Sequence, residues 1–253
     1  MNLPTTRSNL ELRKWDPLTL DGCFNIAVFG ARNTGKSCLV RDLIYNLHRK
    51  GYPRIVVFSG TEEANAGYKS IVPAKYVHNG LNLDEFRTLY ATQKRVVSSW
   101  REAMNSCPDE VKDVDPRLVI VLDDLMYRKH LTKSELFGEI ACNGRHYMIT
   151  LIITVQYVMS LDIVVRSNLD YVIVLRESIP RNMQKLYECF FGIFQRRDDF
   201  YRVLSACTEA YECLVLDKTR PTNCITECVY WYKAALPLPA FVFGSLESRT
   251  WSR

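Results

Sequence analysis

The 253-residue sequence contains no apolar run approaching the roughly 18 residues that a membrane-spanning helix needs. The longest apolar segments, near residues 118–122 and 148–155, are only as long as strands. Internal repeats and low-complexity segments are also absent, so the chain does not read as a repeat protein. The first fifteen residues lack the apolar segment of a signal peptide, and we therefore expect no secretory export.

Cysteine pairs of the C-x-x-C type are absent, although the chain has nine cysteines. Their number is odd, they are scattered, and several lie in apolar runs, where cysteine acts as a small hydrophobic side chain. This usage predicts free thiols in a reducing, intracellular compartment. The last four are Cys207, Cys213, Cys224 and Cys228, and their spacing matches no familiar zinc-binding pattern, which leaves zinc as a minor alternative.

The composition is that of a folded protein with a sizeable core. Hydrophobic residues make up 47% of the chain and charged residues 24%. The net charge is +5, which permits a nucleic-acid partner without requiring one.

The order of apolar patterns predicts an α/β fold. Several short runs are apolar at every position, as expected of strands buried on both faces of a parallel sheet that helices cover. We expect a mostly parallel, doubly wound sheet. The expected strands are residues 24–29, 54–59, 118–122, 148–155, 171–175, 211–216 and 229–232. The expected helices are residues 36–50, 83–107, 132–142, 182–194 and 197–207, with a break at 108–116.

Two helix ends carry sequence signals. The first helix should stop at Gly51, because glycine is common just beyond a helix C-terminus. Thr132 and Glu135 have the spacing of a capping box at the start of the third.

A phosphate-binding loop is the strongest functional signal. GARNTGKS fits the pattern G-x-x-x-x-G-K-S and lies between an expected buried strand and an amphipathic helix. Its glycines allow a tight turn, its backbone N–H groups face an anion, Lys36 should reach the β- and γ-phosphates, and Ser37 should bind Mg²⁺. The expected nucleotide-binding residues are Gly30, Ala31, Arg32, Asn33, Thr34, Gly35, Lys36, Ser37 and Cys38. A chance match in this context is the weaker alternative.

Two adjacent carboxylates follow the strand expected at residues 118–122. Asp123 is predicted to hold Mg²⁺ and Asp124 to polarise the attacking water as a general base. A second acid favours hydrolysis over phosphate transfer to another substrate. An Asp-rich turn without function is the alternative. The order of the patterns also predicts that the strand at 148–155 lies between the two strands that carry these motifs.

Further polar residues flank that central strand. Gln156 at its end could contact both the γ-phosphate and the water, although a polar residue is common at any strand end. Arg145, just before the strand, could reach the nucleotide of a neighbouring subunit, or could be a basic residue at a helix C-terminus. The sequence leaves both alternatives open.

With these segments, together with RSNLDYVIVLRE and VYWYKA, the chain resembles the genome-packaging ATPases of nucleocytoplasmic large DNA viruses, the poxvirus-type packaging ATPases of the FtsK–HerA superfamily. The resemblance runs from about Asn25 to Ala234. It implies a RecA-like core, a homo-oligomeric ring around double-stranded DNA, and ATP and Mg²⁺ as substrate and cofactor. It also implies packaging into a capsid or portal-like vertex, in the viral factories of the host cytoplasm or in the virion.

The resemblance assigns Gln156 as the sensor and Arg145 as the arginine finger donated in trans, with Arg166 as a second candidate. Many members of the superfamily have Asp-Glu where this chain has Asp123 and Asp124. The resemblance therefore supports the metal role of Asp123 more strongly than the general-base role of Asp124. We expect an N-terminal arm at 1–22, the ATPase domain at 23–235 and a tail at 236–253.

Two other functions compete with a DNA translocase. A nucleotide or nucleoside kinase would share the phosphate loop but should have an arginine-rich lid, and no compact segment of that kind is visible. A GTP-regulated switch should contain N-K-x-D, which is absent. Basic residues that could line a DNA path are Arg128, Lys129, Lys133, Arg196 and Arg197. For each of them alone, a solvated surface position is the simpler interpretation.

Overall fold

A computed structural model of the chain describes residues 11–62, 67–125 and 133–244. Within these residues nine strands form one sheet in the order β1-β9-β8-β7-β2-β6-β5-β3-β4. The strands are β1 (Arg13–Lys14), β2 (Asn25–Phe29), β3 (Arg54–Ser59), β4 (Val77–Asn79), β5 (Leu118–Asp123), β6 (Ile149–Val155), β7 (Tyr171–Val174), β8 (Glu212–Asp217) and β9 (Val229–Lys233).

The sheet is parallel at its centre and antiparallel on one side. All pairs from β7 through β2, β6, β5 and β3 to β4 are parallel. Strand β8 runs antiparallel to both β7 and β9, and β1 lies parallel to β9 at the edge. The mostly parallel α/β fold is thus confirmed. So is the predicted position of β6, which lies between β2 and β5.

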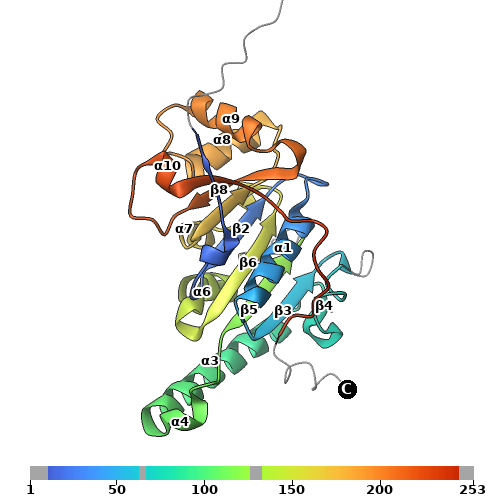
Figure 1. Cartoon of the computed structure of the whole chain (residues 1–253), viewed down its shortest axis with the longest axis vertical. Helices are drawn as coiled ribbons and strands as arrows, with labels where there is room; N and C mark the ends of the chain where they lie inside the picture. Colours follow the sequence, from blue (N-terminus) through green and yellow to red (C-terminus); the bar gives the residue numbers. More distant parts are fainter. Residues whose placement is uncertain (1–10, 63–66, 126–132, 245–253) are drawn as a thin grey trace, which may run out of the picture.

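Helices cover both faces of the sheet (Figure 1). They are α1 (Lys36–Arg49), α3 (Leu83–Ser106), α4 (Pro108–Val111), α6 (Glu135–Asn143), α7 (Ile163–Ser167), α8 (Pro180–Cys189), α9 (Arg197–Ala206) and α10 (Ile225–Cys228). Along β2 the side chains alternate between two cores: Ile26 and Val28 pack with α1, whereas Ala27 and Phe29 pack with α3, α6, α8 and α9. This alternation follows from the two-residue period of a strand.

Several boundaries differ from the sequence prediction. Helix α6 begins at Glu135 with Ser134 as its N-cap, because the Ser134 hydroxyl accepts a hydrogen bond from the Phe137 N–H at 3.3 Å. The predicted cap Thr132 lies outside the described residues. The break expected at 108–116 contains the short helix α4.

Helix α8 begins at Pro180 and ends at Cys189, earlier than predicted. The apolar residues that follow it continue the helical pattern in sequence but pack as a loop, in which Phe191 stacks on Phe200 at 4.7 Å between ring centroids. Helix α1 ends one residue before its C-cap Lys50, and the next residue, Gly51, donates its N–H to the carbonyl of His48 at 3.0 Å.

The segments at both ends of the described chain pack against α1. Trp15 is buried with α1 residues in the same core as Tyr232 of β9. Residues 236–244 run along the outer side of α1 (Figure 1). In this segment Phe241 stacks on His48 and Phe243 is buried. The N–H of Phe243 also donates to the carbonyl of Ile71 at 2.8 Å. The helix that starts at the phosphate loop is therefore supported by residues distant in sequence.

We expect Phe243→Ala to lower the free energy of unfolding by about 3 kcal/mol, because it removes a ring that is 1% exposed. The melting temperature should fall by roughly 6–12 °C. The neighbouring Val242 is 42% exposed, so Val242→Ala should leave the melting temperature almost unchanged. Equal effects of the two substitutions, measured by thermal unfolding, would show that the tail does not anchor α1.

Candidate nucleotide-binding site

A cavity of about 460 Å³ lies at the carboxyl edge of the parallel strands. Thr61, Asp123, Asp124 and Gln156 line it from the ends of β3, β5 and β6. The remaining lining residues belong to the predicted phosphate loop and the start of α1: Arg32, Asn33, Gly35, Lys36, Ser37 and Cys38. The structure therefore brings together the loop, both acids and the amide. Arg32 and Gln156, the first and last of these lining residues, are more than 100 positions apart in the sequence.

The two motif glycines are required for different reasons. A Cβ atom at Gly30 would lie 2.6 Å from the Thr34 hydroxyl and 3.0 Å from Cβ of Leu175, so the loop packs tightly on its own threonine and on the residue that follows β7. Thr34 in turn donates to the carbonyl of Ala31 at 2.8 Å. Gly35 has a backbone φ of +98°, a conformation that residues other than glycine rarely adopt. Helix α1 then begins at Lys36 with its free N–H groups directed at the loop.

Lys36 and Ser37 project from the first turn of α1. The Lys36 ammonium donates to the carbonyls of Gly30 and Ala31 at 2.9 and 2.7 Å, so the positive charge lies within the loop. Burial lowers the pKa of Lys36, and the nearby charges of Asp124 and Asp123 act in the opposite direction. The Ser37 hydroxyl donates to Asp123 Oδ2 at 3.1 Å.

Asp123 is buried at the end of β5, and each hydrogen bond of its carboxylate is accepted from a hydroxyl group. Besides Ser37, its Oδ2 accepts from the Tyr68 hydroxyl at 2.8 Å, and its Oδ1 accepts from the Thr154 hydroxyl at 2.7 Å. Burial and the adjacent carboxylate raise the pKa of Tyr68 well above its usual value, so the phenol keeps its proton and remains a donor. Asp123 is held in one orientation by three hydroxyl groups.

Asp124 points differently from Asp123 because its backbone turns into the left-handed region, with φ of +52°. Its N–H donates to the Thr154 hydroxyl at 2.9 Å. Its carboxylate Oδ1 accepts from Gln156 Nε2 at 2.9 Å. The residue predicted as general base and the residue predicted as sensor are thus hydrogen-bonded to each other.

The sequence patterns did not predict the contacts that Thr154 and Tyr68 make with Asp123. Thr154 connects the two acids, since its hydroxyl donates to one side chain and accepts from the backbone of the next residue. A threonine inside a strand gives no functional signal, because threonine is favoured in strands. Tyr68 lies in the segment after β3, where Glu62 is 2% exposed and accepts from the Tyr68 N–H. Only the fold reveals that this segment reaches Asp123.

Arg145 lies away from the cavity. It belongs to the turn Gly144–Tyr147 that precedes β6, and therefore to the amino edge of the sheet, opposite the phosphate loop. Its guanidinium forms an ion pair with Asp170 at 2.9 Å, and Asp170 also accepts the N–H of Asn25 at 2.8 Å. The Arg145 side chain is 43% exposed. It cannot contact the nucleotide of its own chain, but it remains accessible from outside.

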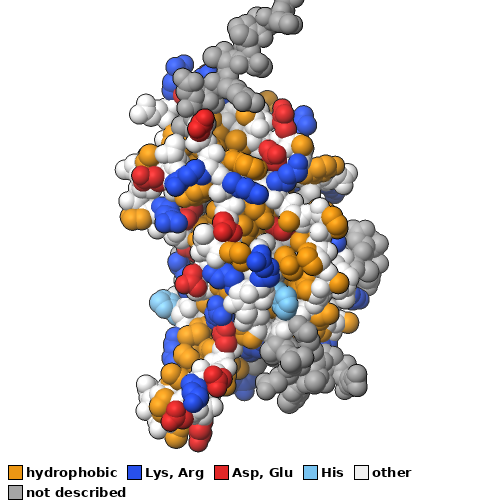
Figure 2. Space-filling model, viewed as in Figure 1, with side chains coloured by type: hydrophobic (Ala, Val, Ile, Leu, Met, Phe, Trp, Pro, Cys, Tyr) orange, Lys and Arg blue, Asp and Glu red, His pale blue; other side chains and the backbone are white. Residues whose placement is uncertain are grey.

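The other predicted cations lie at scattered positions. Arg166 at the end of α7 contacts the sulfur of Met159. Arg197 at the start of α9 lies over the ring of Tyr201 at 5.7 Å. Lys133 and Arg196 are exposed, whereas Arg128 and Lys129 lie outside the described residues. On the face shown in Figure 2, Lys and Arg side chains are interspersed with Asp and Glu.

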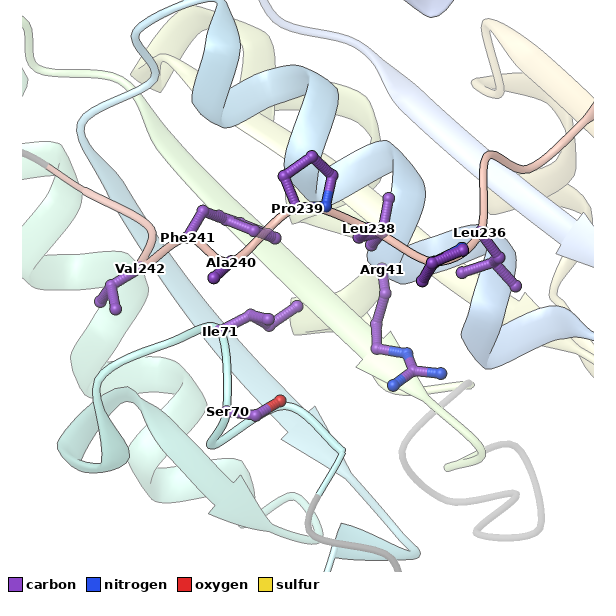
Figure 3. A pocket seen from close by; sticks show the side chains of 10 residues that line it. Arg41, Ser70, Ile71, Leu236, Leu238, Pro239, Ala240, Phe241 and Val242 are labelled. Atoms are coloured by element: carbon purple, nitrogen blue, oxygen red, sulfur yellow. The ribbon is translucent and has the colours of Figure 1, made fainter.

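A second cavity of about 690 Å³ lies beside α1, under residues 236–242 (Figure 3). Arg41 extends from α1 into the space between this segment and the one that carries Ser70 and Ile71. Arg41 Nη2 donates to the sulfur of Cys38 at 3.4 Å, and Arg41 also lines a smaller cavity that contains Ser37 and Asp123. Arg41 therefore lies between the tail segment and the residues around Ser37 and Asp123.

Among the described residues, no three or more His, Cys, Asp or Glu side chains are grouped as a metal site. The late cysteines are therefore not gathered around a common centre. Among the described helices, none is long and apolar enough to cross a membrane.

A protein-family model described as the poxvirus A32 protein matches residues 16–213. The chain belongs to the poxvirus A32 protein family. The family resemblance expected from the sequence is thereby confirmed. A protein of Acanthamoeba polyphaga mimivirus is 30% identical over 211 residues, which cover 83% of this chain and 72% of that protein. A protein of Invertebrate iridescent virus 6 is 27% identical over 227 residues, which cover 89% of this chain and 83% of that protein.

Solved structures share the fold of this family member. The genome packaging NTPase of Sulfolobus turreted icosahedral virus 2, solved in complex with AMPPCP, aligns with a TM-score of 0.57 at 16% identity, covering 87% of this chain and 100% of that one. The conjugation coupling protein TcpA of pCW3, in its monomer form with ATPγS, aligns with a TM-score of 0.57 at 13% identity, covering 90% of this chain and 62% of that one.

We expect Thr154→Val to raise the Mg²⁺ concentration needed for half-maximal nucleotide hydrolysis, because Asp123 loses a donor that orients it. Stability should fall by about 1–3 kcal/mol, since the Asp124 N–H loses its acceptor. Thr150 lies on the same face of β6, four residues towards its amino end, and Thr150→Val is the matched control. A Mg²⁺ requirement that changes equally in both variants would contradict a specific role for Thr154.

Proposed function

We propose that this member of the A32 family is an ATP-driven motor that moves double-stranded DNA into a preformed viral capsid. In each cycle it hydrolyses ATP to ADP and phosphate. The observation that carries the proposal is the cavity in which a phosphate loop faces two carboxylates and an amide. Support for packaging comes from family membership and from the folds that are similar to this one, which include a genome packaging NTPase and a conjugation coupling protein.

The loop and the start of α1 bind the triphosphate. The backbone N–H groups of the loop and the positive end of the α1 dipole favour an anion at this position. Lys36 adds a positive charge at the same place, and the groups that it donates to are carbonyls of the loop itself. Its ammonium can exchange these carbonyls for phosphate oxygens with a small movement of the side chain.

Ser37 and Asp123 suit a Mg²⁺ ion. The Ser37 hydroxyl and Asp123 Oδ2 are 3.1 Å apart, and magnesium prefers a few oxygen ligands from the protein together with phosphate oxygens and water. When bound, the ion would neutralise charge on the β- and γ-phosphates. The other Asp123 oxygen is held by Thr154, which leaves Oδ2 directed towards Ser37 and the loop.

Asp124 is the group that accepts a proton from the attacking water. Gln156 donates to its Oδ1, which fixes the carboxylate and leaves the second oxygen as the acceptor for the water. The amide oxygen of Gln156 is free of this bond and can orient the water beside the γ-phosphate. A pair of acids in these separate orientations fits hydrolysis better than transfer to a second substrate.

The proposed partners are double-stranded DNA, further copies of the chain in a homo-oligomeric ring, and a capsid or portal-like vertex. The proposed place of action is the host cytoplasm, in viral factories, or the virion. Mixed charge on the face in Figure 2 does not offer one basic surface for DNA. The candidate DNA contacts therefore remain the separate cations named above, including Lys133, Arg196 and Arg197.

The first test measures phosphate release from ATP with and without linear duplex DNA. We expect duplex DNA to stimulate turnover several-fold and Lys36→Ala to abolish it, because the ammonium binds the β- and γ-phosphates. Stimulation should weaken strongly between roughly 50 and 200 mM salt, since DNA contacts release counterions. Lys112→Ala, at the end of α4, is a matched control that should behave as the unaltered protein.

Turnover that is indifferent to duplex DNA at low salt would contradict the translocase. Turnover that depends on a nucleoside or nucleotide acceptor, with transfer of the γ-phosphate to that acceptor, would identify a kinase instead.

Arg145 is proposed as the finger that acts on the nucleotide of a neighbouring copy. We expect Arg145→Ala to abolish DNA-stimulated turnover while leaving nucleotide affinity unchanged, because the residue is remote from its own cavity. Asp170→Asn removes the charge that pairs with Arg145 in the same chain, so it should lower thermal stability and preserve turnover. If both variants lose stability to the same extent and both retain turnover, the arginine is structural only.

A further inference from the structure

Tyr211 is an exposed aromatic residue beside the phosphate loop. It is the last residue of the turn Glu209–Tyr211 that precedes β8. Its side chain has no role in the phosphate and metal binding proposed above. A Cβ atom built on Gly35 would lie 3.3 Å from Tyr211 Cδ1, which places the ring against the N-cap of α1. The residue is nevertheless 70% exposed, the highest exposure among the large apolar side chains of the described residues.

The backbone at this turn is in an unfavourable conformation. Ala210 has φ of +51° and Tyr211 has φ of +65°, so two successive residues with Cβ atoms occupy the left-handed region. This conformation is rare for a bulky residue, and neither glycine nor asparagine is present to relieve it. Because the ring is not buried, packing in the core does not compensate for the strain. Such outliers concentrate at ligand-binding positions.

The order of strands gives Tyr211 a definite place relative to the phosphates. Asp123 ends β5, and Asp124 and Gln156 follow β5 and β6, all on one side of β2, where they mark the γ-phosphate end of the proposed site. Strand β8 lies on the other side of β2, beyond β7. It runs antiparallel to β7, with Leu214 opposite Val174, so its first residues reach the same edge of the sheet as the phosphate loop. Tyr211 is thus at the end away from the acids.

We propose that Tyr211 is the platform on which the base of the nucleotide stacks. This inference rests on the proposed nucleotide site and extends it by naming the contact for the base. With the terminal phosphate fixed beside Asp123, the nucleoside extends past Gly35 towards β7 and β8, where the phenol ring presents an open face. The strained turn holds the ring against the loop before nucleotide arrives, so little rotamer freedom is lost on binding. Stacking on an aromatic ring is tolerant of the base, and it predicts affinity for purine nucleotides generally.

The test measures binding of AMPPCP with Mg²⁺ by calorimetry, and binding of inorganic triphosphate with Mg²⁺ in parallel. Tyr211→Asn keeps a residue that tolerates the left-handed backbone and removes the ring. It should weaken AMPPCP binding roughly ten-fold or more and leave inorganic triphosphate unchanged. Tyr211→Trp should restore AMPPCP binding. Val114→Ala, an exposed position after α4 that is 52% exposed, is the control for loss of an apolar surface side chain.

Failure of this inference is distinguishable from failure of the nucleotide site itself. If Lys36→Ala weakens both ligands but Tyr211→Asn weakens neither, the site stands and the stacking platform is wrong. Equal weakening of AMPPCP and inorganic triphosphate by Tyr211→Asn would show that the ring only supports the loop, which also overturns the inference. Unchanged AMPPCP affinity together with lost stimulation by duplex DNA would assign Tyr211 to DNA instead.

Discussion

The parallel pairing of β2, β6 and β5 is the constraint on which the site depends. Phe29 pairs with Val155, and Leu122 pairs with Ile153, so the three strands end at one edge in nearly equal register. A shift of one residue in either pair would turn the polar residues beyond the strands to the wrong face. The register is protected because every residue of these three strands is buried, and each slipped arrangement would place an apolar side chain against the wrong core. The geometry of the candidate site thus follows from core packing.

A second level of order comes from hydroxyl groups between the strands. Thr154, Tyr68 and Ser37 all donate to Asp123, so a buried carboxylate is stabilised without a full positive charge in contact. Such neutral donors offset the cost of burying an anion while leaving it able to bind a cation. An arginine in the same place would form a stronger pair and would compete with the proposed Mg²⁺ ion. The hydroxyl partners therefore suit the metal-binding role that we propose for this carboxylate.

Sequence patterns predicted the centre of the sheet better than its margins. Fully apolar runs such as residues 118–122 have one stable place, between two layers of helices, and both their type and their order followed from the pattern. The two-residue strand β1 and the three-residue strand β4 have no such signal, since their residues form strands only because an edge is available. The segment after α8 misled for the opposite reason, because Phe190 and Phe191 extend a helical period that tertiary packing of the rings overrides.

The same contrast holds for the site. The closeness of Lys36, Asp123 and Gln156 to one another was predictable because each is adjacent to an element with a clear pattern, and all three line one cavity. The places of Tyr68 and Thr154 were not predictable, because each depends on a contact with Asp123 across the sequence. Tyr68 is 55 positions from Asp123 and Thr154 is 31 positions from it. The assignment of Arg145 to a neighbouring subunit stays a prediction.

The two edges of the sheet carry a further consequence. Strand β1 presents only Arg13 and Lys14, both exposed and charged, and β4 ends after three residues at Asn79. Short and charged edges leave few free N–H and C=O groups in line, which discourages the addition of a strand from another molecule. In the proposed ring, neighbouring copies of this chain would therefore meet through side-chain surfaces and not through a continuous sheet. Contacts of that kind can slide and tilt without breaking a ladder of backbone hydrogen bonds, and each copy can change its orientation while its own sheet stays intact.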